Sequence, residues 1–173
     1  MPLPAPIPAP IIVTALLGAA DFAWADGLRR AHFPPERNVL RAHLTLFHHL
    51  PPARLPELVR MLRDTARSAP PAARLTEVMS LGRGTAFRVD SPGLLAIRED
   101  IAEAFRHDLI PQDQGRPRLH ITVQNKVDPA AAKLLHAELS ASFRPRPLAI
   151  AGLAAWHYRG GPWELAQEVK FRG

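Results

Sequence analysis

Residues 41–46 read Arg-Ala-His-Leu-Thr-Leu, and residues 118–123 read Arg-Leu-His-Ile-Thr-Val. His120 follows His43 by 77 residues, and a glycine stands 41 residues after each histidine, at Gly84 and Gly161. A six-residue match that shares a second landmark at the same offset indicates an internal repeat. The sequence therefore predicts that one unit of strand, helix and hairpin is used twice.

Hydrophobic spacing and turn residues divide the chain into strands and helices. Short apolar or alternating runs predict strands at 11–17, 39–49, 75–81, 85–90, 118–127, 148–158 and 163–171. Helical spacing predicts four helices: one from an N-cap at Asp21, one near 53–68, one capped by Ser91-Pro92 that runs to Leu109, and one from Asp128-Pro129. The tight hairpins require antiparallel pairing, so the predicted fold class is α+β, with two similar lobes in a single domain that spans residues 1–173.

The repeated segment presents polar side chains on one face of its strand, because side chains alternate between the two faces. The predicted polar face carries Arg41, His43, Thr45 and Phe47 in the first copy, and Arg118, His120 and Thr122 in the second. If the lobes pack about a pseudo-twofold axis, both polar faces line one cleft. We therefore expect the two imidazoles to face each other there.

Two imidazoles across a cleft can form an acid–base pair. The ordinary histidine pKa of about 6.5 lets one ring accept a proton while the other donates one. Threonine hydroxyls can donate hydrogen bonds to phosphate oxygens, and arginines add charge-assisted contacts. Such chemistry needs no metal ion. For hydrolysis we expect His120 to be the base and His43 the acid, although the symmetry of the motifs leaves the opposite assignment nearly as good.

The segments His43-Leu44-Thr45-Leu46 and His120-Ile121-Thr122-Val123 resemble the paired H-x-T-x motif of the two-histidine (2H) phosphoesterase superfamily. The chain is most similar to the bacterial 2′-5′ RNA ligase and cyclic phosphodiesterase-like family, over nearly its whole length. The resemblance implies a bilobal fold in which two antiparallel sheets line a central cleft with helices outside. It also implies metal-independent attack at 2′,3′-cyclic phosphates or 2′-5′ phosphodiester linkages of RNA or nucleotides.

The resemblance assigns roles to four residues. His43 and His120 would be the acid–base pair, and Thr45 and Thr122 the phosphate binders. We add Arg41 and Arg118 as phosphate binders, because they lie on the same polar strand face as the histidines and at matching positions of the two motifs. The alternative is a nucleotide- or RNA-binding module that keeps the fold without turnover. A pure binder has no reason to retain both acid–base groups, so the sequence favours the enzyme.

Other features of the sequence are weaker candidates for a site. His43 and His49 share a predicted face but lie about 20 Å apart on an extended strand, too far to bind one metal ion. Phe47, Trp156 and Tyr158 are possible base-stacking residues, although core packing is the commoner use of tryptophan. The glycines at 82–84 lack the spacing of a phosphate-binding loop, so we expect no cofactor.

Composition excludes several further classes of protein. The 173 residues contain no cysteine, which excludes disulfide scaffolds, iron–sulfur clusters and thiol catalysis. The net charge of +6 suits a phosphate-bearing partner. Residues 1–10 are proline-rich without a basic n-region, so we do not assign a signal peptide. We expect a cytoplasmic monomer without membrane attachment that acts on RNA ends or small nucleotides bearing a cyclic phosphate.

Overall fold

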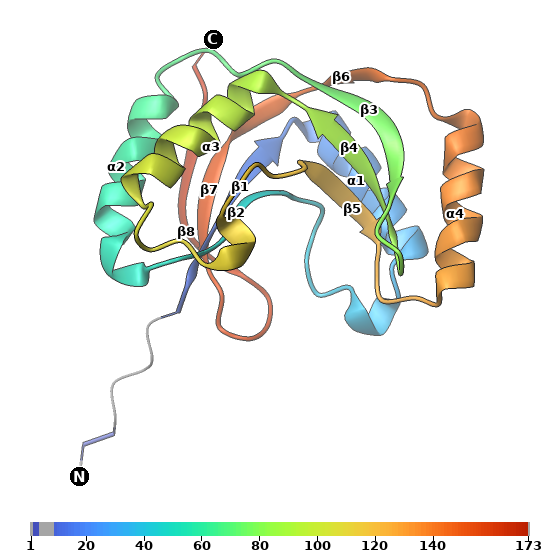
Figure 1. Cartoon of the computed structure of the whole chain (residues 1–173), viewed down its shortest axis with the longest axis horizontal. Helices are drawn as coiled ribbons and strands as arrows, with labels where there is room; N and C mark the ends of the chain where they lie inside the picture. Colours follow the sequence, from blue (N-terminus) through green and yellow to red (C-terminus); the bar gives the residue numbers. More distant parts are fainter. Residues whose placement is uncertain (1, 4–8, 173) are drawn as a thin grey trace.

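The structure is a computed structural model that describes residues 2–3 and 9–172. Most of the proline-rich stretch 1–10, to which we assign no signal peptide, lies outside these residues. Within the described part of the chain, two four-stranded sheets stand side by side with helices on their outer faces (Figure 1). This arrangement confirms the predicted α+β fold with two lobes.

Each sheet is antiparallel throughout. The first has the order β2-β1-β7-β8, with β2 at Leu44–Leu50, β1 at Ile11–Leu17, β7 at Ile150–His157 and β8 at Glu164–Lys170. The second has the order β5-β4-β3-β6, with β5 at His120–Gln124, β4 at Thr85–Asp90, β3 at Ala73–Ser80 and β6 at Arg146–Leu148. The two motif strands, β2 and β5, therefore take the same edge position in their sheets. They contact each other where the sheets meet.

Each sheet combines the motif strand of one repeat with the hairpin of the other. The β3–β4 hairpin follows the first motif but pairs with β5, and the β7–β8 hairpin follows the second motif but joins the sheet of β2 through β1. Gly84 immediately precedes β4, at a point where a Cβ atom would collide with the carbonyl oxygen of Gln124 at the end of β5. Glycine is required there because two backbones come into direct contact.

The helices cover the outer faces of the sheets (Figure 1). Helix α1 (Ala19–His32) packs against β5, and α4 (Pro129–Ser142) packs against β3 and β4. Helix α2 (Leu55–Thr65) packs against β7 and β8, and α3 (Pro92–Ala104) contacts both α2 and β3. Helix α3 therefore covers the seam between the lobes, and its apolar residues enter the core that both lobes share.

Strand β2 is shorter and less regular than the sequence predicts. It begins at Leu44 rather than near residue 39, because the backbone N–H of Ala42 donates to the side chain of Asp26 (3.0 Å) instead of pairing with β1. A bulge then interrupts the ladder between the pairs Thr14–Thr45 and Val13–Phe47. Such a bulge shifts the alternation of faces by one residue.

The bulge overturns the predicted placement of Phe47. Leu46 and Phe47 are both buried, and the Phe47 ring has no exposed surface. The guanidinium of Arg98 covers this ring at 4.5 Å from its centroid. Phe47 is therefore a core residue and cannot stack on a base, contrary to the sequence-based expectation.

Two helix ends also differ from expectation. Helix α1 begins at Ala19, so Asp21 lies inside its first turn and is not the N-cap. Its carboxylate instead accepts hydrogen bonds from Arg146 Nη1 (2.7 Å) and the Ala149 N–H (2.8 Å), which fasten α1 to the start of β7. Helix α3 has the predicted cap, in which Ser91 Oγ accepts from the Leu94 N–H, but the helix ends at Ala104 and not at Leu109.

A buried carboxylate fastens the segment before β5 to β2. Asp113 accepts hydrogen bonds from the backbone N–H groups of His48 and His49, each at 2.9 Å, and from His48 Nδ1 at 2.9 Å. Burial by itself would raise the pKa of Asp113, but these hydrogen bonds outweigh it and lower the pKa from 3.8. The carboxylate is therefore charged at neutral pH and holds the two motif segments together.

Arg98 of α3 completes this clamp from the other side. Its Nε donates to the carbonyl oxygen of Leu46 (2.8 Å), and its Nη2 donates to that of Asp113 (2.6 Å). Nη1 donates to the carbonyl oxygen of Gly115 (3.2 Å). Buried carbonyl groups need hydrogen-bond donors. The buried guanidinium of Arg98 supplies such donors to β2 and to the segment that leads to β5.

Replacing Asp113 with asparagine should destabilise the fold by about 1–3 kcal/mol, because the amide leaves buried N–H donors unpaired. Urea unfolding measures the change. Asp64→Asn is the control, since Asp64 is exposed and its ion pair with Arg67 spans 3.8 Å. The stabilisation by Asp113 is present above the ordinary carboxyl pKa and is lost as pH falls through the lowered folded value. Equal stability of the two variants at neutral pH would contradict the clamp.

Candidate active site

The two motif histidines share one local geometry. His43 Nδ1 hydrogen-bonds to the carbonyl oxygen of Arg41 (2.8 Å), and His120 Nδ1 to that of Arg118 (2.7 Å). A carbonyl oxygen can only accept, so Nδ1 carries the hydrogen in both rings. Each neutral ring therefore has its lone pair on Nε2, which is the atom that can exchange a proton.

Both histidines line a single cleft of about 450 Å³. Thr45 and Thr122 line the same cleft, and all four motif side chains are half-buried. The structure therefore brings together the two motifs that lie 77 residues apart in the sequence. We call this hollow the histidine cleft.

Positive charge surrounds the histidine cleft on two sides. Arg116 and Arg118 line it directly from the segment that precedes β5. Arg29 is buried in α1, where its Nε donates to Asn38 Oδ1 (2.7 Å) and its Nη1 to the carbonyl oxygen of Thr122 (3.3 Å). Arg29 is thus a positioning residue for the second motif as well as a fixed positive charge near the first.

The sequence analysis missed Arg29, Arg116 and the clamp residues Arg98 and Asp113. A signal for Arg29 existed, because it follows Ala25 by four residues and so falls on the apolar face of α1. An arginine on a buried helix face requires polar partners nearby. Arg98 gave the same kind of signal, because it follows Leu94 by four residues on the apolar face of α3. Asp113 gave none, since its partners are groups distant in sequence.

The surroundings of His43 favour its neutral form. Burial is the largest cause, and it lowers the pKa of His43 to about 4. The hydrogen bond to the Arg41 carbonyl acts in the opposite direction, while the charges of Arg29, His120 and His48 lower the pKa further. At neutral pH, His43 therefore presents an unprotonated Nε2 to the cleft.

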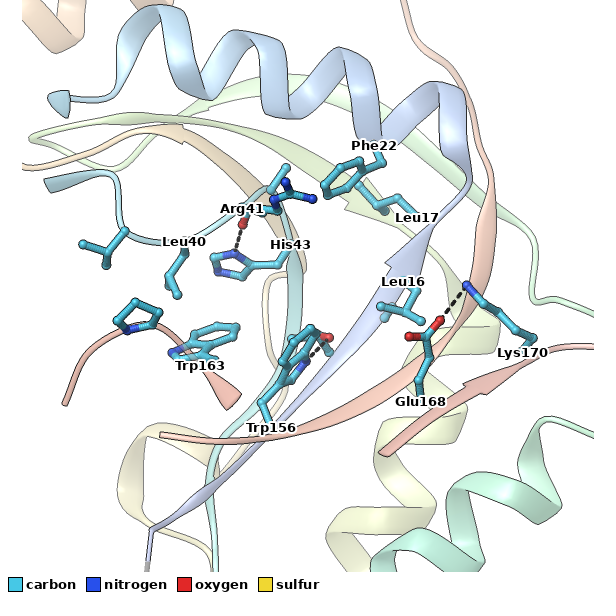
Figure 2. A pocket seen from close by; sticks show the side chains of 15 residues that line it. Leu16, Leu17, Phe22, Leu40, Arg41, His43, Trp156, Trp163, Glu168 and Lys170 are labelled. Atoms are coloured by element: carbon cyan, nitrogen blue, oxygen red, sulfur yellow. Dashed lines mark hydrogen bonds and ion pairs between the residues drawn. The ribbon is translucent and has the colours of Figure 1, made fainter. Parts of the chain in front are cut away.

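A second hollow of about 390 Å³ adjoins the histidine cleft (Figure 2). Trp156, Trp163 and Phe22 line it together with aliphatic residues of β1, so we call it the aromatic pocket. His43 and Trp163 line both hollows. Trp163 meets the His43 ring edge-on with a centroid distance of 4.7 Å, and this contact forms the boundary between the two spaces.

The remaining predicted residues divide between the two hollows and the surface. Arg118 lines the histidine cleft, whereas Arg41 lines the aromatic pocket. The two arginine side chains therefore take different positions, although their carbonyl groups make equivalent hydrogen bonds to the motif histidines. Trp156 lines the aromatic pocket, and its Nε1 donates to Thr14 Oγ1 (2.9 Å). Tyr158 is 44% exposed and lines neither hollow. Trp163, which flanks the same glycine turn as Trp156 and Tyr158, lines both hollows and takes the position expected of a stacking residue.

The described residues offer neither a metal cluster nor a membrane span. No group of three or more His, Asp or Glu side chains among them is arranged to hold a metal ion. None of the helices in the described ranges is both long and apolar enough to span a membrane.

Comparison with solved structures gives the same fold at low sequence identity. TT0787 of Thermus thermophilus is 19% identical with a TM-score of 0.59, over 95% of this chain and 98% of that protein. A structure described as a phosphoesterase is 17% identical with a TM-score of 0.58, over 96% and 100%. E. coli LigT in complex with 3′-AMP is 16% identical with a TM-score of 0.57, over 96% and 100%.

Comparison at the level of sequence gives the family. No curated protein matches the chain. The family model described as the 2′-5′ RNA ligase superfamily matches residues 18–162, a range that contains both motifs, the whole second sheet, and β2 and β7 of the first. The chain therefore belongs to the 2′-5′ RNA ligase superfamily, a family of two-histidine phosphoesterases.

Proposed function

We propose that this protein is a metal-independent phosphoesterase that acts on 2′,3′-cyclic phosphates or 2′-5′ phosphodiester linkages of RNA or nucleotides. The observation that carries the proposal is the pair of imidazoles whose Nε2 atoms are left available at one cleft, each beside a threonine of the same motif. E. coli LigT, which shares the fold, has been solved with ATP and with 3′-AMP. These nucleotides in a structural relative support a nucleotide substrate here.

The hydrolytic step follows from these positions. A water oxygen attacks phosphorus, and the water proton passes to the Nε2 of one neutral histidine. The bond from phosphorus to the ribose oxygen breaks, and the other histidine, protonated on both nitrogens, gives its Nε2 proton to that leaving oxygen. Thr45 and Thr122 donate hydrogen bonds to the non-bridging oxygens, while Arg116 and Arg118 offset their charge.

We assign the base to His43 and the acid to His120, because the low pKa keeps His43 unprotonated in the free protein. This is the reverse of the assignment that we favoured from the sequence. Ligation is the reverse reaction, and it exchanges the two roles. Each lobe supplies one member of the pair, so we further propose that the chain acts as a single unit and as a monomer.

Alanine at either position 43 or 120 should lower kcat by about 10²–10⁴-fold, the usual contribution of a general acid or base. Valine at 45 or 122 should cost less and should act partly on KM, since the hydroxyl binds the phosphate. The assay is turnover of nucleoside 2′,3′-cyclic phosphates and short RNAs in EDTA. The double histidine variant should lose far less than the product of the single losses.

His49→Ala is the matched control for these variants. Its side chain lies on the same strand but lines neither hollow, and only its backbone N–H enters the clamp. Full activity of His43→Ala and His120→Ala would contradict the catalytic assignment. Tight nucleotide binding by the wild type without any turnover would favour the non-catalytic binding module.

The pH profile should separate the two role assignments. If neutral His43 is the base, the fall of kcat/KM on the acid side comes from protonation of His43 near its pKa of about 4. A separate fall at higher pH comes from loss of the proton that the acid must donate. If His43 must instead be protonated in the free protein, kcat/KM falls as pH rises above this pKa of about 4. Titration of the His43 ring by NMR provides the pKa independently, and circular dichroism checks that the protein remains folded at the acid end.

A further inference from the structure

A third hollow lies next to the aromatic pocket, on the side away from the histidine cleft. It measures about 370 Å³ and is lined by Arg63 of α2, Arg67 just after that helix, Lys170 and Arg172, so we call it the basic groove. Glu168 and Lys170 line both the basic groove and the aromatic pocket. The aromatic pocket also shares His43 and Trp163 with the histidine cleft, so each hollow has lining residues in common with the next.

We propose that these three hollows bind the 3′ end of a single-stranded RNA, so that the physiological substrate is an oligoribonucleotide and not a mononucleotide. This inference rests on the proposed function and names its substrate class. The terminal phosphate lies between His43 and His120, and the terminal nucleoside occupies the aromatic pocket. The strand then passes Lys170, and its preceding phosphates bind in the basic groove.

The chemistry of each hollow suits its proposed occupant. The aromatic pocket has the volume of a small-molecule site, and its two tryptophans offer ring surfaces to a base. Aromatic surfaces that lead into a positively charged groove are the usual means of binding single strands without sequence preference. Figure 2 shows Lys170 at the far side of the pocket from His43, where a strand leaving the pocket would pass.

The charges of the basic groove are available to a ligand. Arg63, Arg67, Lys170 and Arg172 are all exposed. Lys170 is paired with Glu168 (2.8 Å), and Arg67 is loosely paired with Asp64 (3.8 Å). No ion pair within the described residues engages the guanidinium of Arg63 or Arg172. The groove therefore carries a net positive charge.

Protection of the sheet edge does not explain this cluster. Strand β8 is the edge of its sheet, and a lysine on an edge strand often prevents pairing with another chain. That role accounts for Lys170. It does not account for Arg63 in α2 and Arg67 in the turn that follows this helix, which line the same hollow.

The experiment compares two substrates with the full-length protein in EDTA. One is adenosine 2′,3′-cyclic phosphate, and the other is a short oligoribonucleotide that ends in the same group. The test variant is Arg63→Gln with Arg172→Gln. The matched control is Arg74→Gln with Arg144→Gln, which removes the same charge from exposed positions that line none of the three hollows.

We expect the test variant to raise KM for the oligoribonucleotide and to leave turnover of the mononucleotide unchanged, because the mononucleotide does not reach the groove. The slope of log(kcat/KM) against log[salt] for the oligomer should become shallower by about 0.7 for each phosphate that the variant no longer binds. The control variant should behave as wild type with both substrates. Equal effects of test and control variants on the oligomer, or no effect of either, would overturn the proposed path.

Failure of the proposed function gives a different result. If the wild type turns over neither substrate, binding of a fluorescent oligoribonucleotide with a 3′-phosphate still tests the path by anisotropy. Weaker and less salt-dependent binding by the test variant alone would then support the path without catalysis. Unchanged binding in that variant would reject it.

Discussion

The site depends on the buried carboxylate of Asp113. The two motif strands lie in different sheets, so no ladder of backbone hydrogen bonds fixes one histidine relative to the other. Asp113 supplies that connection, because it stands just before the second motif and accepts hydrogen bonds from the backbone of the first motif strand. Arg98 secures the same two segments through their carbonyl groups. A catalytic pair needs such fixed positions, since small displacements of reacting groups cost large factors in rate.

The exchange of hairpins between the repeats strengthens this connection. Each sheet contains strands from both repeats, so neither repeat can form a complete sheet without the other. The shared core has the same property, because α3 contacts α2 in one lobe and β3 in the other. Separation of the lobes would therefore expose apolar surface as well as break the clamp, and the histidine cleft is held at a fixed width by both effects.

The sequence predicted every described strand except β6, which pairs with β3 where the prolines at 145 and 147 indicated a break. It also predicted the hairpins and the four motif side chains at the cleft, because those features follow from period-two alternation and from the repeat. It failed where tertiary contacts override local pattern. The bulge at Leu46 reverses the face of Phe47, and the Asp26 side chain removes Ala42 from the strand. Arg29, Arg98 and Asp113 bind largely to backbone groups remote in sequence. No spacing rule for side chains detects partners of that kind, so the positioning network had to come from the structure.

The environment of His43 shows how a duplicated motif can perform two different tasks. Two identical motifs in identical surroundings would hold their protons equally, and an acid–base pair needs one ring neutral while the other is charged. The backbone repeats itself closely here, since each Nδ1 donates to the carbonyl two residues before it. The difference comes from side chains that the repeat does not duplicate. Trp163 covers His43, and the buried charge of Arg29 opposes protonation of that ring. In the proposed mechanism, helix α1 and the β7–β8 connection, which supply these two residues, thus give the two motif histidines distinct roles.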